Sequence, residues 1–302
     1  MSEPSHATTH AIVNRVRRPA VALETTLILH GVPREAARPL AHQLAGIVRS
    51  AGATPAFIGL VAGIPTVGMT DEELRILMDA DTIPKANTSN IGVLIHRRSH
   101  GATTVGTTLE FAAAAGIRLF ATGGLGGAHR DFGSRWDVSG DLAALARFPV
   151  AVVTSGTKSI LDVGSTREML ETLGIPVVGF GTDRFPAFYL RESDSPLDAR
   201  FDQPEDLAGF ISAELARTGR GIVIANPIPE PDAIDPTLWE RWLQEAVSRA
   251  ANASGRDITP RILAELHTIS GGRTLRANLS LIRSNTALAA ELSVRLSEPD
   301  HS

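Results

Sequence analysis

Runs of apolar residues without polar alternation are the feature that most restricts how this 302-residue chain can fold. A strand with one face in water alternates apolar and polar residues, whereas a strand covered on both faces is apolar throughout. Segments with helical spacing separate the runs, among them residues 34–51, 105–115 and 277–296. The pattern predicts an α/β protein, a three-layer α/β/α sandwich with a largely parallel central sheet. The apolar runs are residues 20–23, 54–61, 117–121, 150–154, 176–180 and 221–225.

The domain organisation follows from the same pattern, which contains no internal repeat and no break sharp enough to divide the chain. We therefore predict one catalytic α/β domain over residues 16–298. A flexible N-terminal arm of residues 1–15 is expected before it, because this stretch is polar and lacks the apolar core of a signal peptide.

Composition excludes several classes of partner and chemistry. A net charge of −4 gives no general attraction to nucleic acid or to an anionic membrane, and no apolar run is long enough to span a bilayer. The chain contains no cysteine, which excludes disulfides, a thiolate nucleophile and a zinc-thiolate site. We expect a cytoplasmic protein that binds neither nucleic acid nor membrane.

Lysine is nearly absent, since Lys85 and Lys158 are the only lysines among 29 Lys and Arg residues. Arginine stays protonated in proteins, whereas a lysine can become a nucleophilic amine where burial favours its neutral form. Lys158 follows a predicted buried strand, a position where partial desolvation would favour attack on a carbonyl or on a sugar anomeric carbon. The alternative is that both lysines are incidental.

Polar and glycine-rich segments follow several apolar runs, at the edge where parallel sheets bind ligands. Glu24 ends the first run and would exchange protons with a substrate if an apolar wall raised its pKa. Residues 123–127 read Gly-Gly-Leu-Gly-Gly and would let backbone amides approach a phosphate or a sugar, or would simply form a tight turn. His129 beyond them would serve an anion or be an ordinary packing residue.

Asp137, Ser139 and Asp141 place two carboxylates and a hydroxyl within five residues. Oxygen ligands of this kind hold hard divalent cations. The same residues also form a typical helix N-cap with an acidic first turn. The residues alone leave both interpretations open.

Short motifs follow one another in a fixed order along nearly the whole chain. They read VALETT at 21–26, HG at 30–31, VGMT at 67–70, GATTV at 101–105, ATGGLGGAHR at 121–130, KSILD at 158–162, GFGTDRFPAFY at 179–189, ANPIP at 225–229 and GG at 271–272. In this order they resemble the pseudouridine-5'-phosphate glycosidase family, also called the indigoidine synthase A-like family.

The resemblance implies an enzyme that handles ribose 5-phosphate joined to a base through a carbon-carbon glycosidic bond. Such a bond offers no basic leaving atom to a pair of carboxylates. The family is instead understood to open the sugar ring and to form a covalent adduct between a lysine and the anomeric carbon. Carried to this sequence, Lys158 is the nucleophile, Glu24 the proton donor or acceptor, and Asp137 a ligand of a divalent cation, usually manganese (Mn2+).

The resemblance also implies a set of substrate contacts and a homotrimer with a layered α/β/α fold. The implied substrate-binding residues are Lys85, the backbone of Val105, Thr122, His129, Ser139, Gly140, Asp141 and Asn278.

One segment departs from the family. After its first lysine the family usually continues Val-Ser-Arg-Arg-Asp, whereas this chain reads Ala-Asn-Thr-Ser-Asn at 86–90. The loss of two guanidinium groups and a carboxylate predicts a wider pocket that is less suited to uracil. Similar proteins act as C-glycosynthases, which attach ribose 5-phosphate to an aromatic polyketide-like acceptor, as in alnumycin biosynthesis. Cleavage of a C-nucleotide, C-glycoside synthesis and non-catalytic binding of a phosphosugar all stay open.

Overall fold

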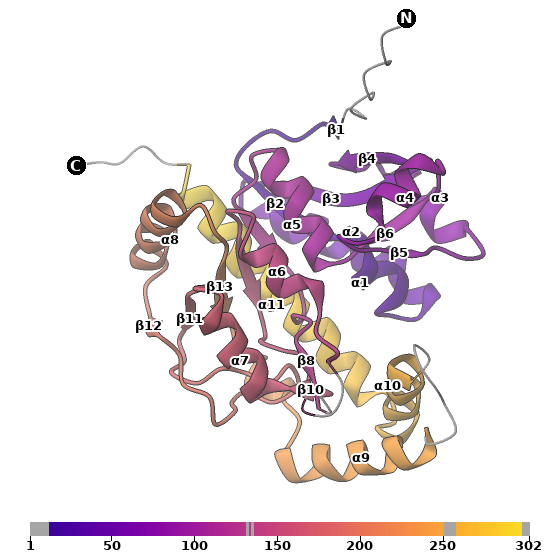
Figure 1. Ribbon diagram of the computed structural model, residues 1–302, viewed down its shortest axis with the longest axis vertical. Helices are drawn as coiled ribbons and strands as arrows, with labels where there is room; N and C mark the ends of the chain where they lie inside the picture. Colours follow the sequence, from indigo (N-terminus) through magenta and orange to yellow (C-terminus); the bar gives the residue numbers. More distant parts are fainter. Residues whose placement is uncertain (1–11, 131–132, 134–135, 251–257, 298–302) are drawn as a thin grey trace, which may run out of the picture.

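The structure, a computed structural model, describes residues 12–130, 133, 136–250 and 258–297 (Figure 1). Its main sheet contains every strand given below except β8 and β10, which pair with each other. The strands are β1 Val13–Asn14, β2 Ala20–Glu24, β3 Thr54–Val61, β4 Ile64–Val67, β5 Lys85–Ala86, β6 Gly101–Thr103, β7 Leu119–Ala121, β8 Ala128–His129, β9 Ala151–Thr154, β10 Leu161–Asp162, β11 Val177–Phe180, β12 Ala199–Phe201 and β13 Ile222–Ala225.

The order across the main sheet is β1-β4-β3-β2-β7-β9-β13-β11-β12, with β6 also paired to β3 and β5 to β6. All neighbours from β3 to β12 run parallel. Antiparallel pairing joins β3 to β4 and β3 to β6. The prediction of a largely parallel sheet is confirmed.

Helices cover both faces of this sheet (Figure 1). The first face carries α1 Thr25–His30, α2 Arg34–Ser50, α3 Asp71–Asp79, α8 Pro204–Thr218, α9 Pro236–Arg249 and α11 Arg273–Arg295, with α10 Ile258–Ile269 packed on α9 and α11. The opposite face carries α4 Ile91–His96, α5 Val105–Ala114, α6 Gly140–Leu145 and α7 Val163–Thr172. A short 3-10 helix, Glu230–Asp232, precedes α9.

Side chains of the central strands alternate between two hydrophobic cores. Val21 and Leu23 of β2 pack with the helices of the first face, whereas Ala22 packs with those of the opposite face. β7, β9 and β13 divide their residues in the same way. Both faces of each strand are therefore covered, which is the physical reason for the uninterrupted apolar runs and confirms the three-layer sandwich.

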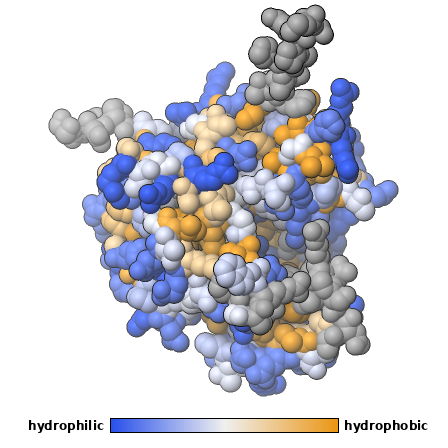
Figure 2. All heavy atoms as spheres, in the orientation of Figure 1, coloured by the Kyte–Doolittle hydropathy of each residue, from blue (hydrophilic) through white to orange (hydrophobic). Residues whose placement is uncertain are grey.

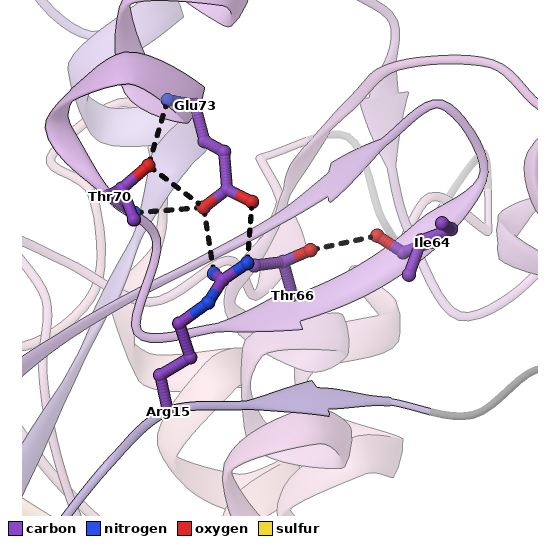
Figure 3. Close-up of polar contacts among 5 residues, drawn as sticks. All are labelled: Arg15, Ile64, Thr66, Thr70 and Glu73. Carbon is purple, nitrogen blue, oxygen red and sulfur yellow. Dashed lines mark hydrogen bonds and ion pairs between the residues drawn. The ribbon is translucent and has the colours of Figure 1, made fainter.

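The N-terminal boundary differs from the prediction. β1 pairs with β4, and the guanidinium of Arg15 donates to both carboxylate oxygens of Glu73 at 2.8 and 2.9 Å (Figure 3). Glu73 also accepts from the backbone of Thr70, while the Thr70 hydroxyl accepts from the backbone of Glu73, which completes a capping box. Residues 12–15 thus belong to the folded domain, and residues 1–11 of the expected arm lie outside the described residues, as does residue 298.

The surface seen in the orientation of Figure 1 is mixed, with hydrophobic residues visible among polar ones (Figure 2). Large apolar side chains with substantial exposure include Ile64 of β4 and Val93 of α4. Across the described ranges, no helix combines the length and the hydrophobicity needed to cross a bilayer.

Neighbouring parallel strands bring polar residues together at the carboxyl edge of the sheet. Glu24 is the last residue of β2, Thr122 follows β7, Ser155 follows β9 and Asn226 follows β13. Because these strands are adjacent and parallel, their ends meet at one edge. Residues separated by about 200 positions in sequence thereby come to lie side by side.

Candidate active site

Glu24 is a buried carboxyl group, with 7% of the residue exposed. The hydroxyl of Thr122 donates a hydrogen bond of 2.5 Å to its Oε1 atom. Burial raises the pKa of Glu24 to about 7, against the opposing effects of the Lys158 charge and of the Thr122 hydrogen bond. A carboxyl that titrates near neutral pH can both donate and accept a proton under ordinary conditions.

The two lysines lie close enough for their charges to interact with each other and with Glu24. Lys85 is exposed as a residue, yet the protein around its ammonium group lowers its pKa, and the positive charge of Lys158 lowers it further. Partial burial lowers the pKa of His30, and the Lys85 charge lowers it further. Cationic groups that repel one another favour the binding of an anion among them.

Lys158 is exposed as a residue, and its role as the nucleophile stays a prediction. Its backbone is nevertheless well fixed. The Lys158 amide donates to the carbonyl of Leu125 at 3.2 Å, and its carbonyl accepts from Leu161 at 2.9 Å. The glycine-rich segment therefore fixes the backbone from which the Lys158 side chain extends.

Asp141 joins two loops through backbone amides. Its Oδ1 atom accepts from the amide of Gly106 and its Oδ2 atom from the amide of Gly126, both at 3.0 Å. Ser139 is the N-cap of α6, and its hydroxyl accepts from the backbone of Asp141. The cap interpretation of this motif is confirmed. Because both Asp141 oxygens are engaged by the protein, its contact with a substrate stays a prediction.

The glycines at 123–127 allow close packing of the segment against its neighbours. A Cβ atom on Gly126 would lie 2.3 Å from the Ser139 hydroxyl oxygen, and one on Gly127 would lie 2.2 Å from the Thr166 hydroxyl oxygen. None of the four glycines has a positive φ, so a left-handed tight turn is not what requires them. The amide of Gly126 is already bonded to Asp141 rather than being available for a phosphate.

Asn278 of α11 presents an unsatisfied acceptor toward this segment. Its Nδ2 atom donates to the carbonyl of Gly31 at 3.2 Å, whereas its buried Oδ1 atom has no hydrogen-bond partner among the described residues. A Cβ atom on Gly123 would lie 3.5 Å from that oxygen. A buried polar atom without a partner is costly unless a ligand or water satisfies it, which supports the predicted role of Asn278 in binding.

Two further predicted residues, Val105 and Gly140, lie at the starts of α5 and α6. Val105 is the first residue of α5, where backbone amides lack intrahelical acceptors, and its side chain is buried in the core. Gly140 begins α6 and is exposed. Thr88 approaches both helix starts: its hydroxyl oxygen would lie 3.2 Å from a Cβ on Gly140, and its methyl carbon 3.4 Å from one on Gly106.

His129 lies in the pairing of β8 with β10, and Asp137 is bonded to it through the backbone. His129 of β8 pairs with Leu161 of β10, and its amide donates to the carbonyl of Asp137 at 3.0 Å. Asp137 is exposed. In the part of the chain that the structure describes, no group of three or more His, Asp or Glu side chains is placed to hold a metal ion. The role of Asp137 as a metal ligand therefore stays a prediction.

The sequence profile of a family described as indigoidine synthase A like protein matches residues 9–295. The chain belongs to the indigoidine synthase A-like family. It is 44% identical to a pseudouridine-5'-phosphate glycosidase of Symbiobacterium thermophilum, over 92% of this chain and 93% of that protein. Identity to the pseudouridine-5'-phosphate glycosidase of Salinispora tropica is 45%, over 93% and 88%.

Solved structures of the indigoidine synthase A-like fold agree closely with this one. The prealnumycin C-glycosynthase AlnA, in complex with ribulose 5-phosphate, matches with a TM-score of 0.86 at 37% identity, over 93% of this chain and 92% of AlnA. An indigoidine synthase A-like protein of Thermotoga maritima matches with a TM-score of 0.88 at 35% identity, over 98% and 100%. The predicted family and fold are therefore confirmed.

Some residues near the site were missed by the sequence predictions. His30 interacts electrostatically with Lys85, and Asn285 of α11 is fully buried among the strand ends. A signal for Asn285 was present, because Asn278 and Asn285 are seven residues apart and share one face of an amphipathic helix. For His30 no spacing rule pointed to Lys85, since the two meet only through the fold.

Proposed function

We propose that this protein makes or breaks the carbon-carbon glycosidic bond between ribose 5-phosphate and a base or aromatic aglycone. The observation that carries the proposal is the meeting of Lys158, Lys85 and Glu24 at the carboxyl edge of the sheet. Support comes from the relatives named pseudouridine-5'-phosphate glycosidase and from AlnA, a C-glycosynthase whose structure contains a pentulose 5-phosphate.

The roles follow from the environments of the three groups. Lys85, together with the amino-terminal end of α5, favours the phosphate of the sugar. The amine of Lys158 adds to C1 of the sugar, the bond from C1 to the ring oxygen breaks, and that oxygen takes up a proton. Glu24 is the buried group that moves protons at this point, because its carboxyl titrates near neutral pH.

Cleavage is completed by two balanced steps. The bond from C1 to the aglycone breaks, its electron pair stays with the aglycone carbon, and that carbon takes up a proton. The remaining iminium between Lys158 and C1 is hydrolysed by water, which returns the free amine and ribose 5-phosphate. Synthesis of a C-riboside is the same sequence in reverse.

A C-glycosynthase that uses an aromatic polyketide-like acceptor is the second candidate. Residues 86–90 favour it, because Thr88 and Ser89 stand where the family usually has two arginines, and Thr88 borders the starts of α5 and α6. Hydrogen bonds within the segment hold it in shape without those arginines: the backbone amides of Asn87 and Asn90 each donate to the other residue's side-chain oxygen, and the Asn90 side chain donates to the carbonyl of Lys85.

Three accompanying proposals need separate tests. Manganese would be held by a carboxylate oxygen of Asp137, and no chemical step above is routed through the ion. Loss of turnover on exhaustive chelation, with recovery on adding Mn2+, would support it. A homotrimer predicts three times the 32.0 kDa chain mass in sedimentation equilibrium. A cytoplasmic location is checked by cell fractionation.

Covalent trapping tests the main proposal. Ribose 5-phosphate is incubated with the protein, borohydride reduces the iminium, and peptide mass spectrometry locates the label, which we expect on Lys158 and not in Lys158→Ala. Pseudouridine 5'-phosphate cleavage is assayed beside ribosylation of aromatic acceptors to identify the aglycone. Binding of ribose 5-phosphate without any adduct or turnover would instead indicate a non-catalytic phosphosugar-binding protein.

A further inference from the structure

A buried asparagine joins the strand ends behind the site. Asn285 lies in the 23-residue helix α11 and is 0% exposed. Its Nδ2 atom donates to the carbonyl of Thr122 at 2.8 Å and to the hydroxyl of Ser155 at 3.1 Å. Its Oδ1 atom accepts from the side chain of Asn226 at 2.9 Å. One side chain from a helix thereby contacts the segments that follow β7, β9 and β13.

The orientation of this amide is determined by its partners. The Thr122 carbonyl can only accept a hydrogen bond, so the nitrogen of Asn285 must face it. The Asn226 amide group donates to the oxygen on the other side. Asparagine is a poor helix former and is rarely buried unless its polar atoms are bonded. Its full burial here is offset by these three bonds, which a hydrophobic residue could not replace.

Thr122 connects this network directly to the proposed proton-transfer group. The Thr122 carbonyl accepts from Asn285, and the Thr122 hydroxyl donates to Glu24. Thr122 directly follows β7, and its amide donates to the carbonyl of Val153 on the neighbouring strand. The bond from Asn285 therefore fixes the carbonyl side of the residue whose hydroxyl reaches Glu24.

The second branch of the network leads toward Lys158. The Ser155 hydroxyl accepts from Asn285 and donates to the carbonyl of Asn226 at 2.9 Å. Ser155 stands three residues before Lys158, and its amide donates to Gly123 of the segment that holds the Lys158 backbone. Both groups of the proposed reaction are thus supported from the same side chain.

We propose that Asn285 is a positioning residue, which fixes Thr122 as the hydrogen-bond donor to Glu24 and holds the strand end that leads to Lys158. It touches neither substrate nor reacting atoms. The kinetic part of this inference rests on the proposed function, whereas the effect on Glu24 itself does not.

The test is a double-mutant cycle read out by the titration of Glu24. The midpoint is followed by carbon-13 NMR of labelled glutamate side chains and assigned as the signal missing in Glu24→Gln. We expect Asn285→Ala to raise the midpoint by about 0.5 to 1 pH unit, because a hydrogen bond that favours the charged carboxylate is weakened. Thr122→Val should raise it similarly, and the double variant no further than Thr122→Val alone.

Thr286→Val is the matched control. Thr286 is the next residue of α11, is equally buried, and its hydroxyl has no hydrogen-bond partner among the described residues. This variant should leave the Glu24 midpoint unchanged. Where Asn285→Ala does not fold, Asn285→Ser takes its place in the same cycle.

Kinetics provide the second readout, in which Asn285→Ala should lower kcat about 10-fold and change KM less than about twofold. The inference is overturned if Asn285→Ala leaves the Glu24 titration midpoint unchanged. It is also overturned if Asn285→Ala shifts that midpoint equally in the wild-type and Thr122→Val backgrounds. A wild-type protein that neither cleaves pseudouridine 5'-phosphate nor forms an adduct with ribose 5-phosphate overturns the proposed function instead. The titration still decides the role of Asn285 in that case.

Discussion

The two sides of the site differ in how their charges are controlled. Glu24 is buried, bonded to Thr122 and supported by Asn285, whereas Lys158 and Lys85 are exposed on the cationic side. The folded chain alone moves the pKa of Glu24 to about 7. The cationic side has no comparable enclosure, so its charges become most effective when an anionic substrate binds. The proposed proton-transfer group is therefore preorganised, whereas the proposed nucleophile depends on the bound ligand.

The largest expected effect comes from replacing the amine while keeping its charge. Lys158→Arg preserves a positive charge near Glu24, but a guanidinium does not lose its proton and cannot form the adduct. We expect turnover to fall at least about 1000-fold, measured by steady-state release of the aglycone. Lys85→Arg, which keeps a charge at the neighbouring position, is the matched control and should be far less affected. Retention of turnover in Lys158→Arg would remove Lys158 as nucleophile.

Replacing the buried carboxyl should have the next largest effect. Glu24→Gln keeps the size of the side chain and removes the proton exchange, for which we expect a loss of about 100- to 10,000-fold in kcat. The wild-type rate should change around pH 7, where Glu24 titrates, and the variant should lack that transition. A pH-rate profile recorded with both proteins checks this, and an unchanged transition in the variant would assign it to another group.

The same substitution should raise stability at alkaline pH. Burial raises the pKa of Glu24 from 4.5 to about 7, so its contribution to stability is present below pH 4.5 and is lost as pH rises through 7. The loss amounts to about 3 kcal/mol in the free energy of unfolding. Urea denaturation should find Glu24→Gln more stable than wild type at pH 8 but not at pH 4.

A surface carboxylate is the control for that measurement. Glu72 is exposed, and its hydrogen bond with Arg75 lowers its pKa, so the sign of its pH dependence is opposite. Glu72→Gln should not gain stability at pH 8. Equal gains in both variants would mean that net charge, rather than burial of Glu24, causes the effect.

The smallest effect is expected at the second lysine. Lys85→Met removes one charge from the cationic side, and we expect KM for the sugar phosphate to rise about 10-fold while kcat changes less. Steady-state kinetics at two ionic strengths measure it, and the wild-type KM should be the more sensitive to salt. A fall in kcat at constant KM would instead place Lys85 in the chemical step.

Several elements were predictable because local pattern and tertiary environment agree. The apolar run at 54–61 matches β3, and the helical spacing at 34–51 matches α2. Helices α7 and α8 were not predicted, because glycine, threonine and charged residues interrupt the helical spacing of their apolar residues. The expected arm was too long, because the bond from Arg15 to Glu73 spans 58 positions and no local sequence pattern predicts it.

The site was predictable in part for the same reason. Glu24 was selected because it stands where an apolar run ends, which is a property of sequence, whereas Thr122 was selected through the family resemblance. The exposure of Lys158 was not predictable, because it depends on which segments pack beside the loop after β9. The glycines at 123–127 were expected at a ligand or in a tight turn, and only the structure showed that Ser139 and Thr166 leave no room for a Cβ atom at Gly126 and Gly127.

Sequence alone determined the layered sheet, the family, and the residue types available for chemistry. Strands buried on both faces are apolar throughout, and the order of the motifs can be read directly along the chain. Only the tertiary structure decided that Asp141 bonds two backbone amides and that Asn285 bonds Thr122 across 163 positions. The physical reason is that a hydrogen bond depends on distance and direction in space. The pKa of Glu24 depends in the same way on how many protein atoms the fold gathers around it.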